Sequence, residues 1–146
     1  MCNTFTGNSN ATSGASFAIK EVITKEGIKI KLDLWDTAGQ EKYRELTKFF
    51  YKDADCIVLG YDITSKSTFE DIKIYWIPQI KSICNPKSMY LIGCKKDCEE
   101  HRTVGSDEAE GFAEQNNLRF FEVSNKYNEG IDEFVEDLAN QIRLMS

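Results

Sequence analysis

Apolar residues occupy every second position from Ile28 to Leu34. Because successive side chains of a strand point to opposite faces, this alternation predicts a strand with one buried face over about 28–35. A second strand is predicted over about 17–23. The two are joined through Lys25-Glu26-Gly27, a short connection that predicts an antiparallel hairpin.

Three short apolar segments later in the chain predict parallel strands that are covered on both faces. They are Cys56-Ile57-Val58-Leu59, Met89-Tyr90-Leu91-Ile92 and Phe120-Phe121-Glu122-Val123. Helices are expected near 43–50, over about 67–84, from Ser106 onward and from Ile131 to Ile142. Strands that alternate with helices predict a doubly wound α/β domain, in which ligands bind at the carboxyl ends of the strands.

Two positions in the predicted helices carry specific expectations. Pro78 lies inside the helix over 67–84, where it removes an amide donor and crowds the preceding turn, so we expect it to kink the helix or end its first half. Ser106 stands where the next helix begins, and its hydroxyl can cap that end. Asp107 and Glu108 suit the positive end of the helix.

Composition indicates one domain over residues 1–146, with a polar leader over 1–16: 41% of the residues are hydrophobic, enough for a single core. A formal charge of −6 without a Lys/Arg cluster argues against nucleic acid as a partner, because binding to phosphates needs a basic face. No apolar run approaches the roughly 18 residues of a membrane span, and no secretory signal pattern is present. We therefore expect a cytoplasmic protein.

The five cysteines, at positions 2, 56, 84, 94 and 98, form no C-x-x-C pair. We expect reduced thiols that behave as small hydrophobic side chains. A zinc site built on Cys94, Cys98 and His101 is the alternative. It has only three candidate ligands, at a spacing unlike that of common zinc modules.

The segment Trp35-Asp36-Thr37-Ala38-Gly39-Gln40-Glu41 closes the second strand of the hairpin. An acid, a glycine and a glutamine between a strand and a helix form a pattern that often serves phosphate chemistry. Asp36 can hold Mg²⁺ through water, the Gly39 amide can bond a terminal phosphate oxygen, and Gln40 can orient an attacking water.

The same segment resembles the second switch region of the small GTPases of the Ras superfamily, and the resemblance extends along nearly the whole chain. Gly39–Thr47, Phe50–Asp55 and Gly60–Thr64 are similar to the Rab branch in particular. The resemblance implies a P-loop-NTPase-like sheet, parallel except for one hairpin strand, and a switch that binds GTP or GDP with Mg²⁺ and hydrolyses GTP, in vesicle traffic. It also implies effector and regulator proteins at the switch surface, around 12–17 and 39–50.

The polar leader is part of this resemblance, because Asn3–Phe17 aligns with the first switch region, where Thr12 would supply a hydroxyl to Mg²⁺. Two further loops are similar to the base-recognition loops of the family: Cys94-Lys95-Lys96-Asp97 and Ser124-Asn125-Lys126. Asp97 can accept two hydrogen bonds from guanine, the stem of Lys95 can lie over the ring, and Asn125 would contribute its backbone N–H. Cys94 stands where the family has asparagine and cannot replace that amide, so base affinity or loop order should suffer.

No segment of the form G-x-x-x-x-G-K-S/T occurs in the 146 residues. In the family this phosphate loop follows a strand that lies between the hairpin and the strand at Ile57. We therefore expect an N-terminally incomplete domain that lacks its first central strand, with two unpaired inner edges and a void. Three explanations stay open: a fragment of a complete GTPase, a partner chain that fills the slot, and a sheet that closes differently.

Without this loop the 146 residues lack the backbone N–H groups and the lysine that offset phosphate charge, so nucleotide binding and turnover should be impaired or absent. Two functions remain open: a Rab-like GTPase switch, and a nucleotide-free module that keeps the Rab surface for protein interactions. No lipidation motif is present, so a position at the periphery of endomembranes is expected only of a full-length form.

Overall fold

The computed structural model describes residues 15–37 and 51–145, with side chains over 18–35 and 51–145. The strands in this part of the chain are β1 (Ala15–Ile23), β2 (Lys29–Thr37), β3 (Cys56–Asp62), β4 (Ser88–Cys94) and β5 (Arg119–Glu122). The helical segments are α2 (Lys66–Asp71), η2 (Ile72–Trp76), α3 (Ile77–Ile83), η3 (Lys96–His101), α4 (Ser106–Gln115) and α5 (Ile131–Met145). The helix expected near 43–50 lies outside the described residues.

β1 and β2 form the predicted antiparallel hairpin, in which Val22 lies opposite Ile30. The side chains of Val22, Ile30 and Leu32 are buried, whereas Ile19 is 55% exposed and Trp35 is 52% exposed. Ile30 and Leu32 of the alternating series therefore lie on a buried face, as a period of two requires, whereas Ile28 precedes β2 and is 36% exposed.

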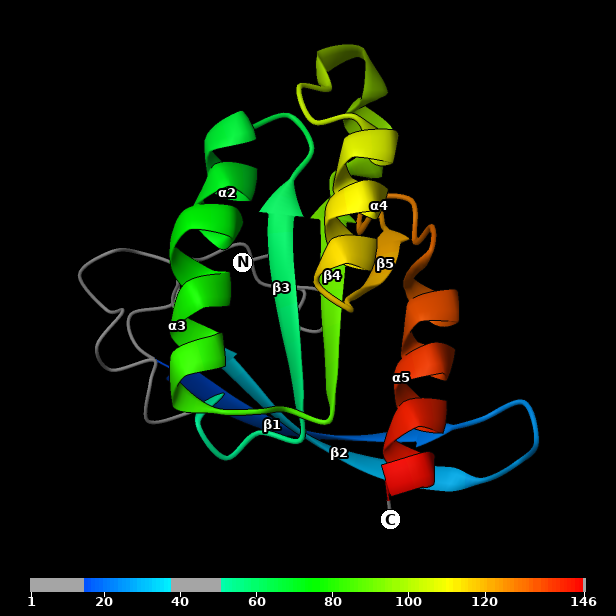
Figure 1. The fold of residues 1–146 in the computed structure, drawn as a ribbon. Coiled ribbons are helices and arrows are strands. Elements are labelled where there is room, and N and C mark those ends of the chain that lie inside the picture. The colour runs from blue at the N-terminus through cyan, green and yellow to red at the C-terminus, as the bar shows by residue number, and fades with distance from the viewer. Residues whose placement is uncertain (1–14, 38–50, 146) are drawn as a thin grey trace.

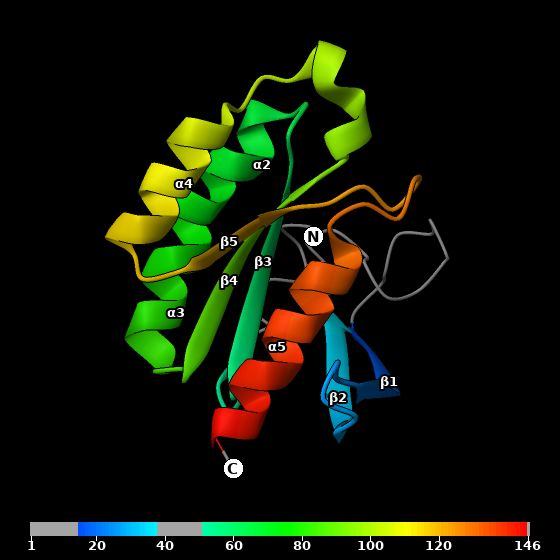
Figure 2. The same ribbon diagram turned by 90° about the vertical axis from the view of Figure 1, so that its right-hand side faces the viewer.

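β3, β4 and β5 form a parallel sheet in that order. Ile57 and Leu59 of β3 belong to an apolar cluster shared with α2, α3 and α4, whereas Tyr90 and Ile92 of β4 belong to a second cluster shared with α5. Figure 2 shows the resulting layers, with α2, α3 and α4 on one side of the sheet and α5 on the other. This arrangement confirms the α/β class. Consecutive buried residues, as predicted for strands covered on both faces, occur in β4, whereas β3 alternates buried and half-buried residues and β5 is at most half-buried.

The hairpin and the parallel sheet are separate, and among the described residues no strand lies between β2 and β3. In Figure 1 the hairpin runs across the lower end of β3 and β4 instead of beside them. Its buried residues Val22, Ile30 and Leu32 share a cluster with Phe134 and Leu138 of α5. The break in the sheet falls where the resemblance places an absent central strand, and α5 covers the apolar face of the hairpin.

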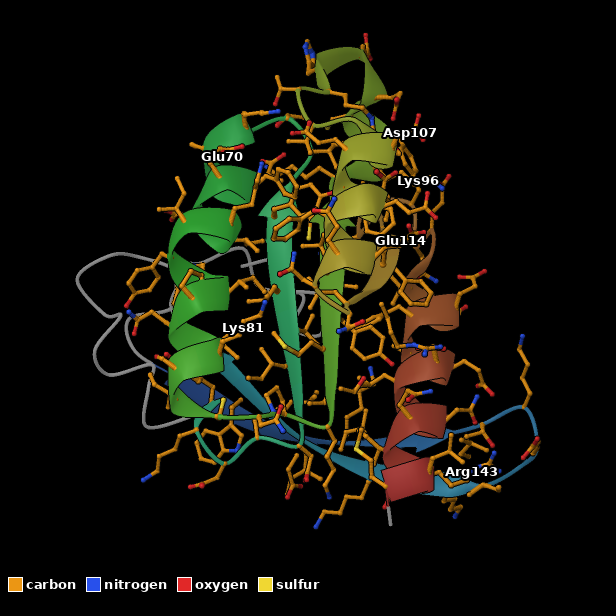
Figure 3. The ribbon with its side chains drawn as sticks, viewed as in Figure 1. Glu70, Lys81, Lys96, Asp107, Glu114 and Arg143 are labelled. Carbon is orange, nitrogen blue, oxygen red and sulfur yellow. The ribbon has the colours of Figure 1, made fainter. Side chains whose placement is uncertain are left out.

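Two polar contacts fix the turn of the hairpin against α5. Arg143 Nη1 donates to Glu26 Oε2 at 2.6 Å, and the Lys25 backbone N–H donates to Glu136 Oε1 at 3.0 Å. Figure 3 shows Arg143 beside this turn. Because Glu26 is largely exposed, these contacts orient the hairpin more than they stabilise it.

The helix predicted over 67–84 is continuous from Lys66 to Ile83, but its middle is π-helical. The Ile77 N–H donates to the carbonyl of Ile72, five residues earlier. Pro78 was expected to kink the helix or end its first half; the helix instead continues through it, with a change of hydrogen-bonding pattern directly before it. The wider π turn directly before Pro78 relieves the crowding between the proline ring and the preceding turn.

Ser106 does not cap α4, which contradicts the prediction. Gly105 is the N-cap, with an extended backbone at φ −67° and ψ 142°, and no side chain caps this end. The Ser106 hydroxyl donates to Glu122 Oε1 at 2.8 Å instead, because a carboxylate is a stronger acceptor partner than a neutral group. Asp107 and Glu108 lie in the first turn, as expected.

Candidate functional site

Two loops meet at the carboxyl ends of β4 and β5. β4 leads into residues 94–97, and β5 leads into residues 124–126. The Lys96 N–H donates to the Val123 carbonyl at 3.0 Å, which ties the two chain segments together. Figure 3 shows Lys96 at this end of the molecule. The two segments predicted to recognise a base therefore lie side by side.

A hydrogen bond between side chains joins these loops. Ser124 Oγ donates to Asp97 Oδ1 at 2.7 Å and accepts the Tyr127 N–H at 3.2 Å. Ser124 is fully buried, so its hydroxyl is held between these two partners. The hydrogen bond from Ser124 is the main reason that the pKa of Asp97 lies below its ordinary value. Asp97 is therefore an ionised carboxylate held in one orientation.

Asn125 and Lys126 lie in an exposed turn closed by Ser124 and Glu129. The backbones of Ser124 and Glu129 exchange two hydrogen bonds of 3.0 Å. Lys126 Nζ lies 5.3 Å from the centre of the Tyr127 ring, so its ammonium group contacts an aromatic face. The turn therefore places the exposed residues Asn125 and Lys126 directly after Ser124, which binds the Asp97 carboxylate.

Lys95 is anchored to the end of β3. Its backbone is left-handed, with φ 65°, and its Nζ lies 2.7 Å from Asp62 Oδ2. Thr64 donates to Asp62 Oδ1 through its backbone N–H at 2.8 Å and its hydroxyl at 2.6 Å. Burial alone would raise the pKa of Asp62, but the hydrogen bonds from Lys95 and Thr64 lower it below its ordinary value.

Asp62 lies in the segment Gly60–Thr64 that resembles the Rab branch, but it was not predicted as a site residue. The sequence could have indicated it, because Asp62, like Asp36, is an acidic residue at the end of an apolar strand. Through Asp62, the ends of β3 and β4 jointly position the stem of Lys95.

Cys94 is 3% exposed, and its Sγ lies 3.9 Å from the Ile92 carbonyl oxygen. Cys56, Cys84 and Cys98 are free, as expected of reduced thiols. Among the described residues no group of three or more His, Cys, Asp or Glu could hold a metal, so the zinc alternative has no structural support.

The residues predicted to handle phosphate and Mg²⁺ cannot be placed in the same way. Thr12, Gly39 and Gln40 lie outside the described residues, and Asp36 is described only by its backbone, as the next-to-last residue of β2. Figures 1 and 2 show β2 toward the opposite end of the parallel strands from the two base-recognition loops. The structure thus brings the residues predicted to recognise the base close together, and the roles of these residues and of the phosphate and metal residues remain predictions.

Comparison with known proteins gives one consistent family. The sequence profile described as "Ras family" matches residues 1–144. Ras-related protein Rab-2B of Dictyostelium discoideum is 40% identical over 140 residues, which cover 94% of this chain and 68% of that protein. Rab-12 of Mus musculus is 39% identical over 142 residues, 96% of this chain and 58% of that protein. GTP-binding protein ypt2 of Schizosaccharomyces pombe is 36% identical over 143 residues, 97% of this chain and 70% of that protein. The chain therefore spans 58% to 70% of the length of these three relatives.

Proposed function

This chain belongs to the Ras family and is of the Rab type, and we propose that it acts as a guanine-nucleotide switch whose base-recognition half is the Asp97–Ser124 site. The hydrogen bond of 2.7 Å from Ser124 to Asp97 is the observation that supports this proposal most strongly. A fixed, ionised carboxylate at the ends of parallel strands can accept from the two neighbouring N–H donors on the edge of guanine. Adenine presents a ring nitrogen acceptor at the corresponding position, which a carboxylate repels.

Three neighbouring residues complete the proposed base contacts. Lys95, anchored by Asp62 at 2.7 Å, would lay its aliphatic stem along the flat face of the purine. To Asn125 we assign a backbone contact with the base. Lys126 would add positive charge beside the bound nucleotide.

Phosphate binding and hydrolysis are proposed to depend on residues outside this site. Thr12 and Asp36 would hold Mg²⁺, which supplies charge neutralisation at the phosphates; Gly39 would bind the terminal phosphate and Gln40 would position water. Because the 146 residues contain no G-x-x-x-x-G-K-S/T segment, we propose that on their own they bind triphosphate weakly and hydrolyse it slowly or not at all.

The break between β2 and β3 suggests one kind of partner. In the described part of the chain β2 and β3 each have a strand neighbour on one edge only. Unpaired strand edges accept further strands through main-chain hydrogen bonds, so we propose that a partner chain can supply the central strand here.

Effector and regulator proteins are the other proposed partners, at the switch surface around residues 12–17 and 39–50. We propose a cytoplasmic protein of vesicle traffic, held at the periphery of endomembranes in a longer form. Within the described residues no helix is long and apolar enough to span a bilayer.

A nucleotide-free interaction module is the second candidate function. Cys94 favours it, because a buried cysteine offers no amide to a base. Such a protein would keep the Rab surface for partner binding and would have no need of Gln40.

Isothermal titration calorimetry of the 146-residue chain with GDP, GTP and ADP in the presence of Mg²⁺ tests the proposal. We expect weak binding of GDP, no measurable binding of ADP, and a loss of GDP affinity of about tenfold or more in Asp97→Ala, since a charged hydrogen-bond acceptor is removed. A folded chain that binds neither nucleotide would favour the interaction module. Equal affinity for GDP and ADP would overturn the role of Asp97.

A further inference from the structure

Arg102 makes an unusually complete set of contacts directly after η3. Its Nε and Nη2 donate to the Glu99 carboxylate at 2.8 and 2.7 Å. Its Nη1 and Nη2 donate to the Glu122 carboxylate at 2.8 and 3.0 Å, and Nη1 also donates to the Val104 carbonyl at 3.0 Å. All five N–H groups of the guanidinium therefore have an acceptor.

The two carboxylates differ in their surroundings. The side chains of Arg102 and Glu122 are 14% and 12% exposed, whereas that of Glu99 is 67% exposed. Burial alone would raise the pKa of Glu122, but the hydrogen bonds from Arg102 and Ser106 lower it. Arg102 and Glu122 thus form a partly buried ion pair held by two hydrogen bonds, and Glu99 is an exposed second acceptor for the same guanidinium.

The two carboxylates that bind Arg102 lie close in sequence to the two base-recognition loops. Glu99 belongs to η3, two residues after Asp97, and Glu122 ends β5, two residues before Ser124. Arg102 therefore spans the same two segments that the hydrogen bond between Asp97 and Ser124 joins.

We propose that Arg102 is a positioning residue for base recognition: by bridging Glu99 and Glu122, it keeps Asp97 within hydrogen-bond reach of Ser124 and so sets the base selectivity of the site. The consequence for nucleotides rests on the proposed function. The geometric part, which concerns Asp97 and Ser124 alone, is testable without any nucleotide.

The fold offers a matched control at the other end of β5. Arg119 also donates to one carboxylate through two nitrogens, with Nε 2.6 Å from Asp137 Oδ2 and Nη2 2.6 Å from Asp137 Oδ1. Loss of Arg119 therefore removes a comparable ion pair from the same strand without touching either base-recognition loop. A purely structural role of Arg102 would give both arginine variants the same effect.

The first experiment is a carboxyl ¹³C NMR titration of Asp97 in the nucleotide-free chain and in Glu99→Gln, Arg102→Gln, Arg102→Lys and Arg119→Gln. Glu99→Gln is the decisive variant, because it leaves the Arg102–Glu122 pair intact and so preserves the fold. Removing the negative charge of Glu99 would by itself lower the pKa of Asp97. A rise of that pKa toward its ordinary value therefore reports lost positioning.

We expect this rise in Glu99→Gln and Arg102→Gln, a partial restoration in Arg102→Lys, and no change in Arg119→Gln. An unchanged or lowered pKa of Asp97 in folded Glu99→Gln would overturn the proposal. An equal rise in Arg119→Gln would also overturn it, because the effect would then be a general loosening of the sheet.

The second experiment compares GDP with inosine diphosphate, which lacks the exocyclic amine that donates to Asp97. We expect Glu99→Gln to lower the affinity for GDP about three- to tenfold and the affinity for inosine diphosphate much less. The ratio of the two affinities should therefore fall. An unchanged ratio would overturn the role in selectivity. If the chain binds neither compound, the proposed function fails, and the carboxyl titration still decides whether Arg102 positions Asp97.

Discussion

Gly130 ends the loop that begins at Ser124, and its backbone is left-handed, with φ +74°. A Cβ at this position would lie 2.4 Å from the backbone carbonyl oxygen of Glu122, a distance that real Cβ contacts do not reach. Gly130→Ala therefore has two separable effects. The left-handed conformation should cost about 1–2 kcal/mol. The contact forces a backbone segment to shift, which should cost a further ~1–3 kcal/mol, as other overpacked sites do.

Gly27→Ala is the matched control for this substitution. Gly27 is also left-handed, with φ +81°, but a Cβ there meets nothing within 4 Å. Its replacement should lower the free energy of unfolding by the conformational part alone, about 1–2 kcal/mol. The difference between the two variants then measures the steric part.

Urea unfolding followed by circular dichroism gives both values, provided the m-values agree. We expect Gly130→Ala to be less stable than Gly27→Ala by about 1–3 kcal/mol. Because the displaced carbonyl belongs to the last residue of β5, Gly130→Ala should also weaken GDP binding while Gly27→Ala leaves it unchanged. Equal stabilities of the two variants would refute the proposed packing of the loop against β5.

Three other substitutions test contacts in the described part of the chain. Gly111 lies inside α4, and a Cβ there meets nothing within 4 Å, so Gly111→Ala should raise the free energy of unfolding by about 0.5–1 kcal/mol in the same urea assay; a decrease would contradict the open space at this position. Burial alone would raise the pKa of Asp137, but Arg119 and Tyr90 hold it below its ordinary 3.8, so its stabilisation is present above pH 3.8 and lost as the pH falls through the folded-state value. The free energy of unfolding should thus fall less steeply with decreasing pH in Asp137→Asn than in the unmodified chain. Equal slopes for the two proteins would argue against the effect. Ser124→Ala removes the donor to Asp97, so carboxyl NMR should show the pKa of Asp97 rising toward its ordinary value, and an unchanged pKa would contradict the hydrogen bond.

The strands and helices of the described residues were largely predictable because periodicity is a local property. The alternation around Ile30 and Leu32 located β2, and the apolar stripe from Ile131 to Ile142 located α5. The placement of the hairpin across the end of the sheet was not predictable. It depends on packing between Val22 and α5, which are far apart in the chain, and no local pattern records such packing.

The same distinction applies to the site. Asp97 and Ser124 could be predicted as site residues, because the two short loops that contain them resemble the base-recognition loops of the family. Arg102 lies in the charged stretch Glu99-Glu100-His101-Arg102, which reads as an ordinary exposed surface. Its role depends on Glu122, twenty residues further along the chain, so only tertiary structure brings the pair together. Ser106 was misjudged for the same reason, since its acceptor is also Glu122.

Guanine recognition by the Asp97–Ser124 site is the central claim, and ¹H–¹⁵N NMR spectra of the chain titrated in parallel with GDP and with ADP test it most directly. The account predicts saturable shifts of the backbone amides over 95–98 and 124–127 with GDP, and none at these positions with ADP. Shifts of the same size with both nucleotides, or GDP binding that leaves these amides unmoved, would contradict it.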